Sequence, residues 1–431
     1  MAASPDVEEQ GTVPVLHLSS VIGRPLVDPD GDRLGRVKDL IIRPGEQPHP
    51  PLAGLVATIA GRDLFVPMRK VATLEPGRVG FQGERVDLRR FERRPGELLL
   101  AQDLKARHLI NFVGGRLIKA NEIELALIDG TWEVVGVDPS GRPLVRRLLP
   151  GGLGRDVRPG TMVDWADIEP FVAHVPTANL RIPYRKLARL HPAQIADLVE
   201  AASHEEGEEI IEAVGQDREL EADVFEELDT GHQVEFIENR SDAEAAEILG
   251  SMAPDDAADL IAELDQERRL PILGLLPEPQ QRKVRSLLSY NPETAGGLMS
   301  PDFLCLPETD TVTQALEAIR ASQAPPETLN VVFTSVPDGG VTGSISAVRL
   351  IKADPAAPLS VVARPNVAHV HADWDLGATV RKMSDFNATV APVMDAEHRT
   401  MLGVVTVDDV LELTLPTGWR RDFGRTAAEA E

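Results

Sequence analysis

Cysteine and long apolar runs are scarce in this chain. A single cysteine, Cys305, stands among 431 residues. It has no partner for an internal disulfide, and no Cys/His spacing typical of a zinc site surrounds it. We therefore expect a small buried side chain in a protein of the reducing cytoplasm. No stretch approaches the roughly 20 apolar residues of a membrane helix, and Met1–Glu9 lacks the basic and apolar parts of a signal peptide, so we expect no membrane insertion.

Aromatic residues are also few, at 4 % of the chain, whereas hydrophobic residues make up 42 %. Aliphatic side chains must therefore form the cores, and the length leaves room for several domains.

Basic charge is lacking in one part of the sequence. The formal net charge is −25. Residues 1–180 hold 24 acidic and 23 basic residues, whereas residues 191–300 hold 27 acidic and 7 basic residues, a balance of −20. Such an excess repels nucleic acid and anionic membranes and attracts cations or basic partners. We therefore predict no nucleic-acid partner.

Motifs of catalysis are missing as well. The sequence has no Gly-x-Ser-x-Gly elbow, no P-loop, no Gly-x-Gly-x-x-Gly opening a helix and no histidine pair at zinc-ligand spacing. His369 and His371 share one face of a strand, and we expect a structural role for them. The arginines around Phe91 are interleaved with Asp87 and Glu92, which favours a solvated loop over a nucleic-acid contact. We predict that the chain is not an enzyme.

The first 180 residues contain a repeat. Asp30–Ile42 lines up with Val113–Leu125, and each is a glycine turn followed by alternating apolar residues, typical of a hairpin leading into a strand. A strand pair and a short end element follow in each copy, which predicts two small, mostly antiparallel β-barrels. The strand pairs are Gly54–Ile59 with Asp63–Val66 and Trp132–Val137 with Pro143–Leu149; the end elements are Val66–Pro76 and Val163–Pro170.

Three strings in this repeat, Gly23-Arg-Pro-Leu-Val, Asp30-Gly-Asp-Arg-Leu-Gly and Phe65-Val-Pro, resemble the PRC-barrel family. The resemblance covers residues 14–178 and is stronger in the first copy, because the second copy has Ile118 where the first has Gly35. It implies a module that docks a protein partner, whose identity the fold does not set.

From His191 onward the apolar period changes from two to about 3.6. Short amphipathic units recur at a spacing of about 24 residues, which predicts a helical solenoid whose units cover one another's apolar faces. The units begin at His191 and recur around Thr230–Asn239, Ala253–Leu264 and Pro277–Ser289.

Three carboxylates open one of these helices. Asp255, Asp256 and Asp259 follow Pro254, where negative charge favours the positive end of the helix dipole. Asp255 and Asp259 are four residues apart, so they share a face and repel each other unless a cation lies between them. Mg²⁺, with its preference for oxygen ligands, suits such a site. An ordinary solvated acidic face with a helix cap is the alternative.

Residues 300–416 fit two β-α-β-β-α units, and two such units packed as a pair resemble CBS domains. The expected helices are Thr313–Ala321 and Leu376–Phe386, and the expected strands are Val331–Thr334, Val341–Ser346, Val390–Val393 and Leu402–Thr406.

The helical region, the joint Tyr290-Asn-Pro-Glu-Thr-Ala-Gly-Gly-Leu-Met299 and the paired units together resemble the cytosolic part of the MgtE magnesium transporters. In that family magnesium holds carboxylates of the helical domain against the CBS pair. The resemblance therefore implies Asp409 and Glu412 as partners of the three carboxylates that follow Pro254. Because the sequence lacks the family's membrane domain, we expect a magnesium-responsive regulatory protein and not a transporter.

Gly403-Val-Val-Thr406-Val-Asp-Asp409 fits the CBS pattern in which threonine and aspartate hydrogen-bond the ribose of an adenine nucleotide such as ATP. In the first unit Arg349 replaces the acid, so the resemblance implies at most one such ligand. The alternative function is an adaptor that senses adenine nucleotide within a larger assembly. CBS pairs often dimerise, and we expect a homodimer through them.

The fold class predicted for the whole chain is multidomain α+β. The expected parts are a flexible N-terminus (1–13), two PRC-like barrels (14–97 and 98–178), an MgtE N-like helical superhelix (179–299), tandem CBS domains (300–416) and a flexible tail (417–431).

Overall fold

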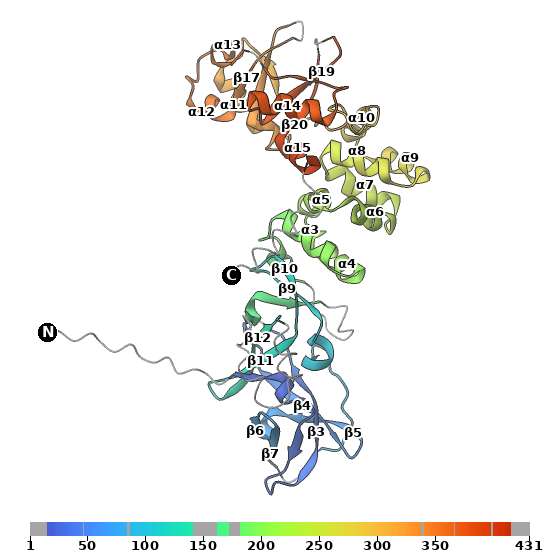
Figure 1. Cartoon of the computed structure of the whole chain (residues 1–431), viewed down its shortest axis with the longest axis vertical. Coiled ribbons are helices and arrows are strands. Elements are labelled where there is room, and N and C mark those ends of the chain that lie inside the picture. Colours follow the sequence, from blue (N-terminus) through green and yellow to red (C-terminus); the bar gives the residue numbers. More distant parts are fainter. Residues whose placement is uncertain are drawn as a thin grey trace, which may run out of the picture. The chain divides into compact units, whose positions relative to one another are not determined.

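The computed structural model describes residues 15–45, 47–83, 87–140, 162–171, 182–337, 340–365, 367–397 and 400–414. The chain divides into two compact units, Met1–Leu220 and Glu221–Glu431, whose elements run from blue to green and from yellow-green to red in Figure 1. Both contain mixed α+β structure, as the sequence predicts. The predicted strand Pro143–Leu149 and the two expected flexible ends, 1–13 and 417–431, lie outside the described residues.

Alternating apolar side chains build one large sheet in the first unit. Its strands are β2 (Pro25–Val27), β3 (Arg33–Ile42), β4 (Leu52–Ile59), β5 (Arg62–Pro67), β6 (Val71–Glu75), β7 (Arg78–Phe81) and β8 (Leu98–Leu99). The order is β5-β4-β3-β2-β7-β6, with β8 beside β3. Gly35 of β3 lies so close to the Thr58 carbonyl that a Cβ atom would collide with it. This approach requires glycine there, whereas Ile118 of the second copy is a core residue.

The second β-copy forms two smaller sheets. Its strands, with β1 from the start of the chain, are β1 (Val15–His17), β9 (His108–Asn111), β10 (Arg116–Lys119), β11 (Glu122–Ile128), β12 (Thr131–Asp138), β13 (Val163–Asp164) and β14 (Ile168–Pro170). The orders are β1-β11-β12-β13 and β10-β9-β14. Strand β1 places Leu16 opposite Leu125 of β11, so the first copy contributes a strand to the sheet of the second. One core cluster then runs through both copies.

The end elements of the two copies are alike, as predicted. A single 3₁₀ turn follows β5 in the first copy, η2 (Met68–Lys70), and another follows β13 in the second, η5 (Trp165–Asp167). The two predicted barrels take a different form, because among the described strands the sheets run as open paths and no closed barrel is present.

Between residues 184 and 287 the described elements are helices. They are α2 (Tyr184–Leu187), α3 (Pro192–Ala201), α4 (His204–Val214), α5 (Arg218–Glu227), α6 (Thr230–Glu238), α7 (Asp242–Ser251), α8 (Pro254–Glu263), α9 (Gln266–Leu275) and α10 (Glu278–Leu287). Helices α3, α6, α8 and α10 lie where the sequence predicts them. In the second unit α6 packs on α8, α7 on α9 and α8 on α10. This stacking of alternate helices confirms the solenoid.

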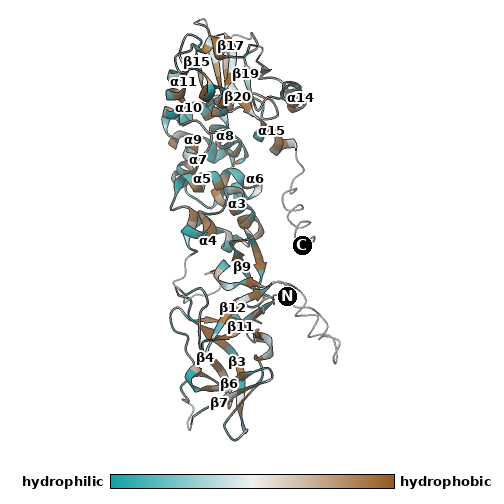
Figure 2. Cartoon of the chain, turned by 90° about the vertical axis from the view of Figure 1, so that its left-hand side faces the viewer, coloured by the Kyte–Doolittle hydropathy of each residue, from teal (hydrophilic) through white to brown (hydrophobic). Residues whose placement is uncertain are grey.

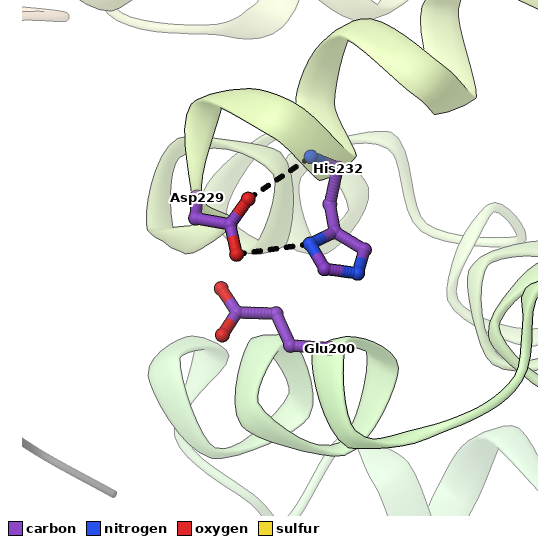
Figure 3. A group of neighbouring side chains, drawn as sticks. All are labelled: Glu200, Asp229 and His232. Carbon is purple, nitrogen blue, oxygen red and sulfur yellow. Dashed lines mark hydrogen bonds and ion pairs between the residues drawn. The ribbon is translucent and has the colours of Figure 1, made fainter. Parts of the chain in front are cut away.

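Side chains cap several of these helices. Ser241 accepts a bond from the Glu244 N–H group, and the Glu244 carboxylate accepts one from the Ser241 N–H group. Asp229 caps α6, because its Oδ1 accepts the backbone N–H group of His232 at 3.0 Å and its Oδ2 lies 2.9 Å from the His232 ring Nδ1 (Figure 3). Ala253, before α8, has no side chain that can do this, so the start of α8 needs a hydrogen-bond acceptor from elsewhere.

The predicted pair of β-α-β-β-α units is present at the C-terminal end. The elements are β15 (Cys305–Pro307), α11 (Val312–Ala321), β16 (Val331–Ser335), β17 (Val341–Ser346) and α12 (Ala347–Lys352), then α13 (Leu359–Val362), β18 (Val370–His371), α14 (Leu376–Phe386), β19 (Val390–Met394), β20 (Met401–Thr406) and α15 (Val407–Thr414). In each unit the first strand pairs in parallel and the third pairs antiparallel.

The two units share a core between their sheets. Phe333 of the first unit packs with Val390 and Val404 of the second, and Cys305 lies half-buried against this cluster. Burial raises the pKa of the Cys305 thiol, which agrees with the expected structural role. Strands β19 and β20 of the pair are largely brown in Figure 2, because most of their residues are hydrophobic and buried.

The joint between the helices and the CBS pair is attached to the second β-α-β-β-α unit by backbone bridges. Thr294 bridges to Asp375, and Ser300 bridges to Val404 of β20. Close approaches require glycines here, because a Cβ atom on Gly296 would meet the Tyr290 ring and the Ala372 carbonyl. Lys283 of α10 adds an ion pair with Asp302 at 2.5 Å.

Candidate metal centre

The first turn of α8 carries two of the three predicted carboxylates. Asp255 and Asp256 lie in this turn, and Asp259 follows one turn later on the side of Asp255. Asp255 and Asp256 are half-buried, whereas Asp259 is exposed. The positive end of the helix dipole stabilises negative charge in the first turn, and Ala253 contributes no competing side chain.

Asp255 has an unusual environment. Its Oδ1 atom is enclosed and has no hydrogen-bond partner among the described residues. Burial, and next the nearby Asp409 carboxylate, raise the pKa of Asp255 to about 8. The carboxylates of Glu226 and Asp259 add to the same repulsion. A negative charge on Asp255 is therefore destabilised unless a proton or a cation neutralises it.

Asp409, in the first turn of α15, lies near enough to Asp255 for its charge to raise the pKa of that residue. Its Oδ2 accepts the Thr406 N–H group at 3.0 Å, and its own N–H group donates to Thr406 Oγ1 at 3.3 Å. This reciprocal pair is a capping box with aspartate in place of glutamate, and it holds the carboxylate rigidly. Burial is the main cause that raises the pKa of Asp409, and Asp408 adds repulsion.

Glu226 of α5 is a carboxylate that the sequence did not single out. Its Oε1 accepts the backbone N–H group of Ala253 at 2.5 Å, so Glu226 supplies the acceptor that the start of α8 lacks. Burial raises the pKa of Glu226 to about 7, and Asp223, Glu327 and Glu227 add repulsion in that order. The acidic run Glu221–Glu227 was a visible signal. Which of its members reaches α8 depends on tertiary packing.

The structure thus brings Asp255, Asp259 and Asp409 into one electrostatic group and adds Glu226. Glu412 lies in α15, but its side chain is outside the described part of the chain. Among the described residues, none of these carboxylates belongs to a set of three ligand atoms within 4.8 Å of one another. The donor set is all oxygen and sparse, which fits Mg²⁺, an ion that binds one or two carboxylates and keeps several waters.

The predicted nucleotide residues have structural partners. Thr406 is buried and bonded to Asp409. A Cβ atom on Gly403 would meet the Ser300 carbonyl and the Met299 side chain, so the joint covers this glycine. In the first unit Ser346 Oγ accepts the Arg349 N–H group, but an arginine side chain has no acceptor with which to complete the box.

A cavity of about 270 Å³ lies elsewhere in the pair. It is lined by Gly340, Val341, Thr342, Val367, His369, Pro392 and Met394, from both units. Its walls are polar and apolar in nearly equal parts, and the polar groups include the Thr342 hydroxyl and the His369 ring. Gly403, Thr406 and Asp409 do not line it.

Comparisons with known proteins agree with this architecture. Residues 190–293 match the MgtE intracellular N domain, and residues 360–415 match the CBS domain. Together with the two β-α-β-β-α units, these matches define a protein in which an N domain of this type precedes a CBS pair.

The relatives make the assignment more specific. The magnesium transporter MgtE of Thermus thermophilus is 30 % identical over 217 residues, which are 44 % of this chain and 48 % of the transporter. The MgtE of Bacillus subtilis is 23 % identical over 193 residues, which are 45 % and 43 % of the two chains. From the helical domain to the CBS pair, the chain is homologous to the cytosolic part of MgtE. It spans less than half the length of these curated relatives.

A solved structure shows the same similarity to the cytosolic part of MgtE. The crystal structure of the cytosolic domain of the Mg²⁺ channel MgtE in complex with ATP is 29 % identical, with a TM-score of 0.50, and covers 53 % of this chain and 93 % of its own. Among the described residues, no helix is both long and apolar enough to cross a membrane.

Proposed function

We propose that this chain is a magnesium-responsive regulatory module, in which divalent cations bridge α8 of the helical domain and α15 of the CBS pair. The observation that carries the proposal is the enclosed Oδ1 of Asp255, which has no hydrogen-bond partner within the described ranges and lies near the carboxylate of Asp409. The proposed ligands are Asp255, Asp256, Asp259, Asp409 and Glu412, with Glu226 as a further acid at the same place.

The mechanism is a two-state one. When no cation is bound, the ionised carboxylates of the two domains repel each other and favour separation of α8 from α15. When Mg²⁺ is bound, its charge offsets the repulsion and favours the closed arrangement. A ligand that prefers one of two states shifts the balance between them, which is the minimum that a sensor needs.

Calorimetric titration tests the metal site. Adding Mg²⁺ from about 0.1 to 20 mM, the range of weak carboxylate sites, should produce saturable heat, and Asp255→Asn should abolish most of it. Glu267→Gln, which removes an equal charge from the exposed first turn of α9, is the matched control and should leave the heat unchanged. Absence of binding in the unaltered protein would rule out the proposal.

X-ray scattering tests the switch separately. The protein should be more compact in excess magnesium than in chelator, and Asp255→Asn should remove that difference. Identical scattering profiles under the two conditions would leave a binding site without a switch.

A second candidate function is adenine-nucleotide sensing by the CBS pair. The cavity between the two units favours it, and a similar cytosolic domain was crystallised with ATP. We propose Gly403, Thr406 and Asp409 as the ribose-side residues and the cavity as the alternative position. Thermal shifts with ATP, ADP and AMP in chelator should be abolished by Asp409→Asn in the first case and by His369→Ala in the second. Unchanged melting of the parent protein would exclude both.

The β-rich region is proposed to dock a protein partner, as its resemblance to PRC barrels implies, with 14–97 and 98–178 as its two modules. A pull-down with the full chain at low and high magnesium tests this. We expect a partner that is lost when residues 14–178 are removed. A partner whose retention also depends on Asp255 would connect docking to the metal switch.

A further inference from the structure

Two histidines lie side by side at the cavity of the CBS pair. His369 and His371 flank Val370, the first residue of β18, so they share one face of the chain there. Their ring centres are 5.8 Å apart, and their planes are inclined by 82°. Both side chains are half-buried, and His369 is one of the residues that line the cavity.

A backbone hydrogen bond fixes the tautomer of His369. Its Nδ1 atom lies 3.3 Å from the Val367 carbonyl oxygen, and because a carbonyl can only accept, Nδ1 carries the hydrogen. The neutral ring then has its lone pair on Nε2. A histidine that ligates a metal usually bonds its other ring nitrogen to a carbonyl or carboxylate in this way, since the bond sets the tautomer and the ring orientation.

A thioether lies on the same face of the sheet. In the parallel pair of β18 and β19, His371 is the register partner of Met394, so the two side chains leave the sheet on the same side. Met394 is only 4 % exposed and lines the cavity together with His369. Two imidazole rings and a sulfur atom are therefore gathered on one side of β18 and β19.

The spacing of the two rings suits an ion between them. A metal lies about 2.0–2.1 Å from a ligating imidazole nitrogen and about 3.2 Å from the ring centre, so two ligating rings have centres about 5–6.5 Å apart. The observed 5.8 Å falls within that range. Edge-to-face packing, the structural alternative, accounts for the ring contact but not for the thioether and the cavity beside it.

We propose that His369, His371 and Met394 bind a soft transition-metal ion, with Cu⁺ as the ion that suits them best. Imidazole and thioether ligands together select Cu⁺, whereas Mg²⁺ takes oxygen ligands. The ligands proposed for magnesium at α8 and α15 are all carboxylates, so the two sites take different metals. Neither the magnesium bridge nor a bound nucleotide enters this proposal.

Competition with a chromogenic Cu⁺ chelator tests the site, under anaerobic, reducing conditions and without nucleotide. The full chain with Cys305→Ser, which removes the one thiol, is the parent of all variants. It should retain one Cu⁺ per chain, and a large excess of Mg²⁺ should not displace the ion. His369→Gln and His371→Gln should each weaken binding by about tenfold or more, and Met394→Leu should weaken it less.

Two matched substitutions serve as controls. His108→Gln changes a histidine of β9, and Met383→Leu changes a buried methionine of α14. Both should leave the Cu⁺ affinity unchanged. Loss of all Cu⁺ from the Cys305→Ser protein to the chelator would overturn the proposal, and so would an equal affinity of the His369 and His371 variants and their parent.

X-ray absorption at the copper edge gives a second readout, which does not depend on the folding of the histidine variants. The loaded Cys305→Ser protein should show nitrogen and sulfur scatterers, and the sulfur signal should disappear in Met394→Leu. Oxygen and nitrogen scatterers alone in the loaded Cys305→Ser protein would contradict the site. A sulfur signal that persists in Met394→Leu would assign the ion to another methionine and would contradict it as well.

Discussion

Both compact units of this molecule bury carboxylates, but the groups that surround those carboxylates differ. In the β-rich region Asp103 accepts the Leu99 N–H group at 2.7 Å and pairs with Arg93 at 2.8 Å, and Glu97 pairs with Arg43 at 2.8 Å. Near α8, Asp255 has an enclosed oxygen without a hydrogen-bond partner among the described residues, and the charges that act on it are those of other acids, Asp409, Glu226 and Asp259. Carboxylates that stabilise a fold are surrounded by donors, whereas a carboxylate among other acids needs a proton or a cation to offset their repulsion.

Asp39 shows how much donors contribute. It is only 3 % exposed and accepts N–H groups from Leu40, Ala101 and Gln102. Burial raises the pKa of Asp39 to about 6, against the lowering effect of these three bonds. The pKa of Asp255 rises to about 8. The two environments therefore differ in whether hydrogen bonds offset the burial of charge.

The largest expected effect comes from removing a well-partnered acid. Asp103→Ala should destabilise the β-rich region by about 3 kcal/mol, because it leaves the mostly buried Arg93 guanidinium and the Leu99 N–H group without their acceptor. Denaturant unfolding measures the loss, and hydrogen exchange of peptides covering 87–104 locates it. Asp87→Ala, which breaks the exposed pair with Arg89, is the control and should change little. Equal effects of the two substitutions would show that the buried pair of Asp103 contributes no more to stability than the exposed pair of Asp87.

An intermediate effect, of opposite sign, is expected at α8. Without divalent cations, the compact unit Glu221–Glu431 should lose stability as the pH rises from about 4 to 8. Over that window Asp255 and Glu226 keep protons when folded and lose them when unfolded, so the unfolded state binds fewer protons. Asp255→Asn should therefore stabilise the cation-free protein by about 2 kcal/mol at pH 8.

The same measurements with magnesium sharpen this result. Denaturation in chelator and in excess Mg²⁺, across the pH range, should show magnesium stabilising the parent protein most at high pH and Asp255→Asn hardly at all. A flat pH profile of the parent in chelator would mean that Asp255 is not held among uncompensated acids.

The smallest effect is expected at the ion pair of the joint. Lys283 and Asp302 are partly exposed, so Lys283→Met should cost about 0.5 kcal/mol. Lys283→Arg keeps the charge and should restore most of this. A loss as large as that of Asp103→Ala would show that the joint depends on the ion pair more than on its backbone bridges.

Local sequence patterns predicted much of the fold. The bounds of α14 and β17 coincide with the predicted segments, because their periodicity and caps are local. Helices α4 and α7 were not singled out, although each begins with a serine followed three residues later by glutamate, a readable capping box. The pairing of β1 with β11 joins residues more than a hundred positions apart. No local pattern specifies such a contact.

The candidate site was predictable only in part. The spacing of Asp255 and Asp259 follows from helical geometry, but the approach of Asp409 was implied by the resemblance alone. Glu226 was missed because its role depends on a contact between α5 and the N–H group of Ala253. Gly403 was read as part of a ligand motif, and the structure supplies a packing reason for it, contact with Met299 and Ser300.

The attachment of the joint has a mechanical consequence. Thr294 and Ser300 anchor the joint to the second CBS unit. Helix α10, which precedes the joint, is therefore the end of the helical stack nearest that anchor, and α8 packs on α10 and α6 on α8. Any tilt at that end produces displacements that grow with distance along the stack. If the proposed bridge between α8 and α15 tilts the helices at the glycine-rich joint, the displacement would therefore be larger at α6 than at α8.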